Sequence, residues 1–218
     1  MVNVTDQAER ARLRELVRRG YDAISCAYRS DDGGANASSG ETTTTYAGWI
    51  EELAALQPAG GSVLDLGCGA GVPAARDLVD RGFNVTGIDI SEVQIERAQR
   101  LVPGGRFICA DMATWDASAG SFDAIISLYA LIHVPLADQR ALFPRMRRWL
   151  VDDGHLLAVV GVGRWTGIES YFGTDMFWDH ADTSSYLQWL AEAGIRPLWH
   201  RFVPEADGGH TLVLARAV

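Results

Sequence analysis

The spacing of hydrophobic positions changes near residue 62 of the chain. Before that point, apolar residues recur every three or four positions, which is the spacing of one face of a helix. We predict one or two helices from Thr5, a candidate N-cap, to Arg29, with Gly20 as the point of interruption if there are two. A loop rich in Gly, Ser and Asp at 31–40 and a second helical stretch at 41–56 should follow.

From Ser62 onward, short β-prone apolar runs alternate with amphipathic helices. The predicted strands are 63–66, 83–88, 107–110, 122–131 (with its exit) and 154–162, and the helices between them end near Arg81, Leu101 and Leu150. Parallel strands need crossover connections that pass over the sheet, so this alternation predicts a parallel sheet covered on both faces. The expected class is α/β with a doubly wound sheet.

The regular alternation lapses after the fifth predicted strand. Between Trp165 and Trp189 there are seven aromatic residues in 25, against 9% in the whole chain, and we interpret the start of this stretch as an insertion. A helix is predicted at 183–193. Two further β-prone runs, at 197–203 and 210–215, flank a glycine-containing turn and predict a terminal hairpin.

Composition narrows the function further. The 218 residues fit one full-sized domain with an embellishment, and 48% hydrophobic residues can fill one core. A net charge of −9 disfavours binding to nucleic acid or to anionic membranes. All 19 basic residues are arginine, which excludes a P-loop lysine and a lysine Schiff base.

Three cysteines, Cys26, Cys68 and Cys109, lie 42 and 41 residues apart without a C-x-x-C pair. This spacing argues against a disulfide framework and against a zinc site, so no metal is expected. The N-terminal residues lack the apolar run of a signal peptide, and no window reaches 18 apolar residues. These observations predict a cytoplasmic protein without a membrane partner.

The strongest local signal is the run from Val63 to Gly71, in which an apolar strand leads into glycines at 67, 69 and 71 with a helix behind. Glycine lets the chain turn sharply and lets a ligand approach the backbone closely. The spacing is G-x-G-x-G rather than the dinucleotide G-x-G-x-x-G, and no Lys-Ser/Thr pair follows for a triphosphate. The turn alone is a modest indication of a nucleotide site.

Acidic residues also follow the next two strands. Asp89 stands 22 residues after Gly67, where a carboxylate at a strand end can accept the ribose hydroxyls of a nucleotide. Asp111 follows the third strand, where a carboxylate could take the adenine amino group, and Ile90, Met112 and Trp115 offer apolar surface to the ring. A single acid after a strand is more often a helix cap, but ligands at three consecutive strand ends favour an adenosine site.

In combination, the runs Val63–Gly71, Gly87–Ser91, Ala110–Met112 and Phe122–His133 resemble the class I S-adenosylmethionine-dependent methyltransferases of small-molecule type. The resemblance covers residues 61–164. It implies that the glycine turn wraps the methionine part of S-adenosylmethionine, Asp65 positions its amino group, and the later strand ends hold the adenosine. The cofactor-binding residues expected on this basis are Tyr21, Tyr28, Asp65, Gly67, Cys68, Gly69, Gly71, Asp89, Ile90, Ser91, Asp111, Met112, Ser127 and Leu128.

The resemblance also implies a Rossmann-like methyltransferase fold, a seven-stranded, mostly parallel sheet whose last strand is antiparallel. The terminal hairpin fits that arrangement. We expect one methyltransferase domain over 1–218, made of an N-terminal helical cap (1–58), a cofactor-binding core (61–164), a substrate lid (165–182) and a terminal helix with its hairpin (183–218).

Methyl transfer from a sulfonium needs an aligned nucleophile in a dry pocket, and a base only where the acceptor has a proton to lose. His133, after the fourth strand, is the first candidate base; it could equally cap or pack at that turn. His180 is the second, with Asp179 or Asp182 to orient it; the alternative is a surface histidine beside an Asp182 helix cap.

The aromatic stretch after the fifth strand falls at the sheet edge where the cofactor is expected, so we interpret it as a substrate lid. Trp165, Phe172, Phe177 and Trp178 are the candidate substrate contacts, although such residues also serve as ordinary core. They favour a flat, apolar acceptor.

The expected activity is methyl transfer from S-adenosylmethionine to an oxygen, nitrogen or carbon atom of a small aromatic or apolar molecule, by a monomer or homodimer. Three alternatives stay open. A macromolecular methyltransferase usually carries a basic face or an added binding domain, which this sequence lacks. A non-catalytic binding module would keep the pocket without turnover, and a hydride-transfer enzyme would bind NADH.

Overall fold

The computed structural model describes residues 6–32, 43–205 and 208–218, and its centre is a seven-stranded sheet with the order β3-β2-β1-β4-β5-β9-β8. Strands β1 to β5 pair in parallel, and β9 pairs antiparallel with both β5 and β8. The predicted doubly wound α/β fold with an antiparallel last strand is therefore confirmed. The strands are β1 (Ser62–Leu66), β2 (Asn84–Asp89), β3 (Arg106–Cys109), β4 (Phe122–Ser127), β5 (Leu150–Gly161), β8 (Ile195–Glu205) and β9 (Gly208–Ala217).

Helices cover both faces of the sheet, as the crossover argument predicts. One apolar cluster joins a sheet face to α2 (Thr43–Ala54), α3 (Ala74–Asp80) and α4 (Glu92–Leu101). A second cluster joins the other face to α5 (Leu136–Trp149) and α6 (Thr183–Glu192). A short 3-10 turn, η1 (Leu131–His133), follows β4.

The N-terminal helix α1 (Gln7–Tyr28) is one continuous helix, so Gly20 does not interrupt it. The reason for glycine there is packing, because a Cβ at Gly20 would lie 2.8 Å from the Cε of Met176. The helix is capped by Asp6, whose carboxylate accepts from the backbone N–H of Ala8 at 3.2 Å. The expected cap at Thr5 lies outside the described residues, as do 33–40 of the expected loop.

The aromatic stretch is regular, which corrects the expectation of an irregular insertion. It forms an antiparallel hairpin of β6 (Trp165–Tyr171) and β7 (Thr174–His180) around a two-residue turn at Phe172 and Gly173. Both turn residues have positive φ, 49° and 81°, which matches the right-handed twist of a hairpin. This turn has the pair Phe172-Gly173 in place of the Asn-Gly or Asp-Gly pair that commonly marks such a turn.

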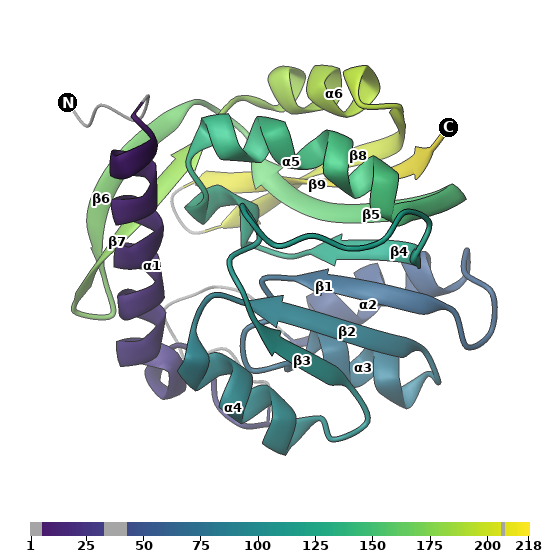
Figure 1. Cartoon of the computed structure of the whole chain (residues 1–218), viewed down its shortest axis with the longest axis horizontal. Coiled ribbons are helices and arrows are strands. Elements are labelled where there is room, and N and C mark those ends of the chain that lie inside the picture. Colours follow the sequence, from purple (N-terminus) through teal and green to yellow (C-terminus); the bar gives the residue numbers. More distant parts are fainter. Residues whose placement is uncertain (1–5, 33–42, 206–207) are drawn as a thin grey trace.

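The hairpin packs on α1, and α1 in turn lies at the carboxyl ends of the parallel strands. Leu13, Val17 and Ile24 of α1 form a buried cluster with Met176 and Phe177 of β7. Figure 1 shows α1 standing at the arrowheads of β1 and β2, with the hairpin beside it. Among the described helices, none combines the length and the apolar character needed to cross a membrane.

Candidate active site at the carboxyl ends of the strands

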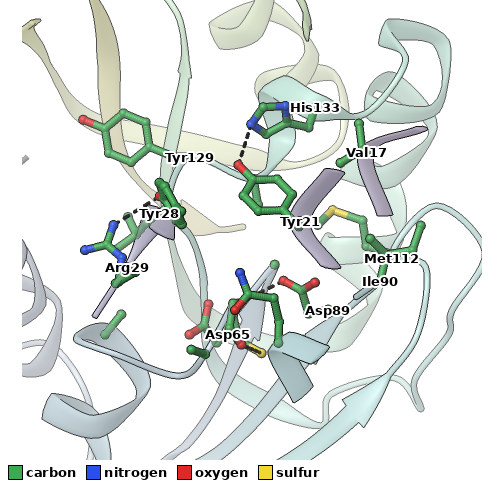
Figure 2. A pocket seen from close by; sticks show the side chains of 18 of the residues that line it. Val17, Tyr21, Tyr28, Arg29, Asp65, Asp89, Ile90, Met112, Tyr129 and His133 are labelled. Atoms are coloured by element: carbon green, nitrogen blue, oxygen red, sulfur yellow. Dashed lines mark hydrogen bonds between the residues drawn. The ribbon is translucent and has the colours of Figure 1, made fainter. Parts of the chain in front are cut away.

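A pocket lies where the ends of β1 to β4 meet the inner side of α1 (Figure 2). About 950 Å³ of space around it is not filled by protein atoms, a figure that includes solvent at its open mouth. In open α/β sheets, ligands bind at this edge of the sheet.

The glycine turn after β1 forms the floor of the pocket, through Gly67, Cys68 and Gly69. Gly67 has φ +77°, and a Cβ there would lie 2.1 Å from the Cβ of Ala130, so only glycine fits. Gly71 does not line the pocket. A Cβ on Gly71 would press on Val102 at 3.1 Å, so the third glycine serves the packing of the turn against the core.

Asp65, the last polar residue of β1, is buried, and its Oδ2 has no hydrogen-bond partner. Burial, and then the nearby charge of Asp89, raise the pKa of Asp65 to about 8. A buried carboxyl oxygen without a partner is costly, and a cationic ligand would satisfy it. Since Asp65 lines the pocket, the pocket wall offers a site for an ammonium group beside the Asp65 carboxyl.

Asp89 lines the same pocket and is held in place from both sides. Its Oδ2 accepts from the backbone N–H of Gly69 and its Oδ1 from that of Ser91, each at 2.9 Å. Burial raises the pKa of Asp89 to about 6, while these two N–H groups act in the opposite direction. Each oxygen keeps acceptor capacity for a ligand.

Ile90 lines the pocket beside Asp89, but Ser91 does not. The Ser91 hydroxyl accepts from the backbone N–H of Gln94 at 3.1 Å and donates to Asp22 of α1 at 2.6 Å. Ser91 is therefore an N-cap of α4 that also ties α4 to α1.

After β3, Asp111 and Met112 both line the pocket, whereas Trp115 does not and packs on Trp149 with ring centroids 5.3 Å apart. The Asp111 carboxylate is engaged by the protein itself: it accepts from Arg14 of α1 at 2.7 Å and from the backbone N–H of Ala113 at 2.9 Å. Arg14 also bonds to Asp138 at the start of α5. This triad fastens α1 over the strand ends.

After β4, Leu128 lines the pocket and Ser127 does not. The buried Ser127 hydroxyl donates to the carbonyl of Leu66 at 2.9 Å, which joins β4 to β1. The next residue, Tyr129, lines the pocket in a left-handed conformation with φ +60°.

Tyr21, Tyr28 and His133 also line the pocket, and Figure 2 shows Tyr21 and His133 across it from Asp65 and Asp89. His133 Nδ1 lies 2.8 Å from the carbonyl oxygen of Phe177, and its Nε2 lies 2.9 Å from the Tyr21 hydroxyl. Because a carbonyl only accepts, Nδ1 carries the proton and Nε2 accepts from Tyr21. Burial lowers the pKa of His133 to about 4, which keeps the ring neutral at physiological pH.

The hairpin residues predicted to bind substrate do not line this pocket: Trp165, Phe172, Phe177 and Trp178. Phe177 is fully buried against α1, whereas Trp165 is 47% exposed. His180 is also absent from the pocket wall, and its Nδ1 lies 2.5 Å from the carbonyl of Gly163. The structure therefore brings His133, but not His180, to the pocket.

Five polar or aromatic residues that line the pocket had no place in the sequence prediction: Arg14, Arg29, Tyr46, Gln94 and Tyr129. Tyr129 falls within the quoted run after the fourth strand, so the run itself could have indicated it. Arg14, Arg29 and Tyr46 lie on α1 or α2 or at their ends, and no local pattern marks which helix face meets the strand ends.

Comparisons with known proteins agree with this geometry. A family model described as a methyltransferase domain matches residues 63–154. The 2-methyl-6-phytyl-1,4-hydroquinone methyltransferase of Synechocystis is 40% identical over 107 residues, which make up 47% of this chain and 32% of that protein. The match therefore spans only about a third of that relative's length.

Among solved structures, magnesium protoporphyrin IX methyltransferase of Synechocystis with bound S-adenosylmethionine has a TM-score of 0.72 at 19% identity, over 94% of this chain and 97% of that one. The cyclase SpnF has a TM-score of 0.73 at 20% identity, over 92% and 94% of the two chains. Likeness at this level of identity concerns the fold, and the two names show that one fold carries different reactions.

Proposed function

We infer that this chain, a class I S-adenosylmethionine-dependent methyltransferase by its fold and core sequence, transfers a methyl group from S-adenosylmethionine to a small organic acceptor. The acceptor atom is an oxygen, nitrogen or carbon of a small aromatic or apolar molecule. We further propose that the protein is cytoplasmic, in keeping with its three free cysteines. We also propose that it is a monomer or a homodimer.

The observation that carries this proposal is the convergence of the glycine turn, Asp65 and Asp89 on one pocket. The partnerless buried oxygen of Asp65 suits the ammonium group of the cofactor, and the acceptor capacity of Asp89 suits its ribose hydroxyls. Ile90 and Met112 offer the apolar surface that an adenine ring requires. The residues present therefore fit S-adenosylmethionine.

When bound, S-adenosylmethionine supplies an electrophilic methyl group on a sulfonium. The protein's part is to hold the acceptor in line with that methyl group and to keep water out. The α1 helix provides the cover, since the Arg14–Asp111 and Ser91–Asp22 contacts fix it across the strand ends.

The pair formed by Tyr21 and His133 can handle the acceptor's proton. The Tyr21 hydroxyl lines the pocket and donates to the lone pair of His133 Nε2. When the Tyr21 oxygen takes a proton from the acceptor, Tyr21 can pass its own proton to Nε2. The low pKa of His133 makes this a weak base. It therefore favours acceptors that lose a proton readily, such as acidic hydroxyls, or amines that arrive neutral.

The tyrosine rings that line the pocket support an aromatic or apolar acceptor. They come from α1, α2 and the end of β4, at Tyr21, Tyr28, Tyr46 and Tyr129. We propose these four rings, rather than those of the hairpin, as the acceptor contacts. This changes the assignment of Tyr21 and Tyr28, which the sequence resemblance gave to the cofactor.

The test is a turnover assay on a panel of phenols, aromatic amines and enolisable ketones, with formation of S-adenosylhomocysteine as the readout. We expect turnover by the wild type, and a loss of about 10- to 100-fold in kcat for Tyr21→Phe and His133→Ala. Affinity for S-adenosylhomocysteine should be unchanged in both variants. Tyr171→Phe, on the hairpin outside the pocket, is the matched control.

Two outcomes would count against the proposal. Binding of S-adenosylhomocysteine without turnover on any acceptor class would favour a non-catalytic binding module. Full activity of both variants would reduce Tyr21 and His133 to packing residues.

A further inference from the structure

The turn that carries His133 is bound along the edge of β7 that faces away from β6. His133 Nδ1 lies 2.8 Å from the Phe177 carbonyl oxygen, and Gln139, buried in α5, donates to the Asp179 carbonyl at 2.5 Å. In an antiparallel pair, alternate residues turn their backbone groups away from the partner strand. Phe177 and Asp179 are two residues apart on β7, so the strand bonds to the turn and to α5 at two successive positions.

The side chain of Asp179 adds a third connection, to the first turn of α5. Its Oδ2 accepts from the backbone N–H of Leu136 at 2.8 Å, and its Oδ1 accepts from the Thr166 hydroxyl of β6 at 2.6 Å. Pro135, the N-cap residue of α5, makes no side-chain cap bond. Asp179 therefore caps α5 from the hairpin, where the helix dipole favours a negative charge.

This cap is an unusual way to satisfy a helix end. Asp179 is 2% exposed, and its carboxylate is held by neutral donors. A buried charge is costly unless it is hydrogen-bonded, so these bonds offset the cost only while β6, β7 and α5 keep their relative positions. The sequence suggested that Asp179 orients His180, but His180 Nδ1 lies against the Gly163 carbonyl and the Asp179 carboxylate fixes the segment after His133.

The position of the Phe177 carbonyl decides which ring nitrogen of His133 carries the proton. A carbonyl beside Nδ1 keeps the proton there and leaves the Nε2 lone pair facing the Tyr21 hydroxyl. If β7 moved away from the turn, Nδ1 would lose its acceptor. The proton could then reside on Nε2, which in that form cannot accept from Tyr21.

We propose that Asp179 is a positioning residue for methyl transfer. By fixing β7 to the start of α5, it holds the Phe177 carbonyl at His133 Nδ1 and keeps Nε2 open to the Tyr21 hydroxyl. The proposal rests on the proposed function, because it takes Tyr21 and His133 as the pair that handles the acceptor's proton. Asp179 does not line the pocket, so it acts only through β7 and the turn.

The ¹⁵N NMR signals of the His133 ring test the proposal without turnover, because protonated and unprotonated imidazole nitrogens give separate signals. Spectra at neutral pH of protein with ¹⁵N-labelled histidine, compared with those of His133→Gln, identify the two signals. The wild type should show Nδ1 protonated. Asp179→Asn replaces one accepting oxygen by an NH₂ group, so the Nε2-protonated form should gain population and the two ¹⁵N shifts should move toward each other.

Turnover of the same variant shows the consequence for the reaction. In Asp179→Asn, kcat should fall about 10-fold because the pair is misaligned, while KM for S-adenosylmethionine stays unchanged. If this variant does not fold, Thr166→Val, which removes only the hydroxyl that bonds to Asp179, should move the ring signals in the same direction by a smaller amount.

Asp182→Asn is the matched control. Asp182 also caps a helix, α6, through the backbone N–H of Ser185 at 2.9 Å, and among the described residues its carboxylate bonds only to Ser184 and Ser185. This variant should therefore lose a comparable cap while it keeps the ring signals of His133 and the kcat of the wild type.

Three outcomes overturn the proposal. Unchanged ring signals in Asp179→Asn would make Asp179 a helix cap alone, whatever its kcat. An equal change in Asp182→Asn would mean that any lost cap loosens the turn. A wild type with Nε2 protonated would remove the arrangement that Asp179 is proposed to hold. Changed ring signals with unchanged kcat would instead support the positioning and contradict the role of His133 in the proposed function.

Discussion

The pocket has two walls, and they are built in different ways. One wall consists of the carboxyl ends of β1 to β4, where Asp65 lies near the end of β1, Asp89 ends β2 and Met112 lies three residues after β3. The other wall consists of α1, which is positioned by contacts to residues far away in sequence, such as Arg14 with Asp111, 97 residues apart. Strand topology fixes the first wall, whereas tertiary packing fixes the second.

The comparison separates residues whose role can be inferred from sequence from those whose role cannot. A strand end in a parallel sheet lies at a known edge, so an acid after a strand is placed by the topology alone. A helix that crosses this edge has no such rule, and the face that α1 turns to the pocket depends on tertiary packing, including its packing with the hairpin. Each prediction below acts on one wall and leaves the other intact.

The largest expected effect concerns the hairpin that supports α1. Phe177→Ala removes a fully buried ring from the cluster with α1 and should lower the free energy of unfolding by about 3–5 kcal/mol. Trp165→Ala, in the same hairpin but 47% exposed, should change it by less than about 0.5 kcal/mol. Denaturant unfolding of both variants measures this, and equal losses would contradict the packing described for the hairpin.

The second prediction acts on the strand-end wall. Gly67→Ala combines a left-handed backbone with a 2.1 Å approach to the Ala130 Cβ, and should destabilise the fold by about 3 kcal/mol. Gly82→Ala has a similar φ of +88° but no atom within 4 Å, and should cost only about 1–2 kcal/mol. Comparing the thermal unfolding of the two variants separates the cost of the steric clash with Ala130 from the cost of the left-handed backbone. If Gly67→Ala were as stable as Gly82→Ala, the close approach of the glycine turn to Ala130 would be wrong.

The smallest predicted effect is a pH dependence that arises at Asp65. The pKa of this residue is raised to about 8, so the free protein holds a proton there at neutral pH. An ammonium group bound beside Asp65 lowers that pKa, and binding then releases the proton. Affinity for S-adenosylhomocysteine should therefore rise with pH from 6.5 to 8, by at most about tenfold per pH unit, and level off above 8.

Calorimetry in two buffers of different ionisation enthalpy measures the proton release directly. Asp65→Asn should bind more weakly and lose the pH dependence. The pKa of Asp89 is raised only to about 6, so its titration lies below this range. A wild-type affinity that did not change between pH 6.5 and 8 would remove Asp65 from the ammonium site.

Much of the fold followed from the sequence because the alternation of apolar runs and amphipathic helices after Ser62 admits few topologies. For the same reason Gly67, Asp65 and Asp89 lie at one pocket, and their role as cofactor ligands stays a prediction. Residues of the same motifs proved harder to interpret. Gly71, Ser91 and Ser127 fall within the quoted motifs, yet they serve packing, helix capping and strand joining.

The hairpin and the arginines of α1 could not be predicted. The aromatic residues of β6 and β7 favoured a substrate lid, but Phe177 and Met176 bury their side chains against α1. Gly20 was interpreted as a helix interruption because the sequence does not show that Met176 packs against it. The positions of Arg14 and Arg29 depend on which face of α1 meets the strand ends, and that follows from tertiary packing.

The central claim is that the strand ends hold the adenosine of S-adenosylmethionine, and titration of S-adenosylhomocysteine into wild-type protein and Asp89→Ala tests it most directly. The account predicts binding by the wild type and a loss of about 1–3 kcal/mol of binding free energy in Asp89→Ala, with no change in the surface variant Asp152→Ala. Absence of binding by the wild type, or unchanged affinity in Asp89→Ala, would contradict it.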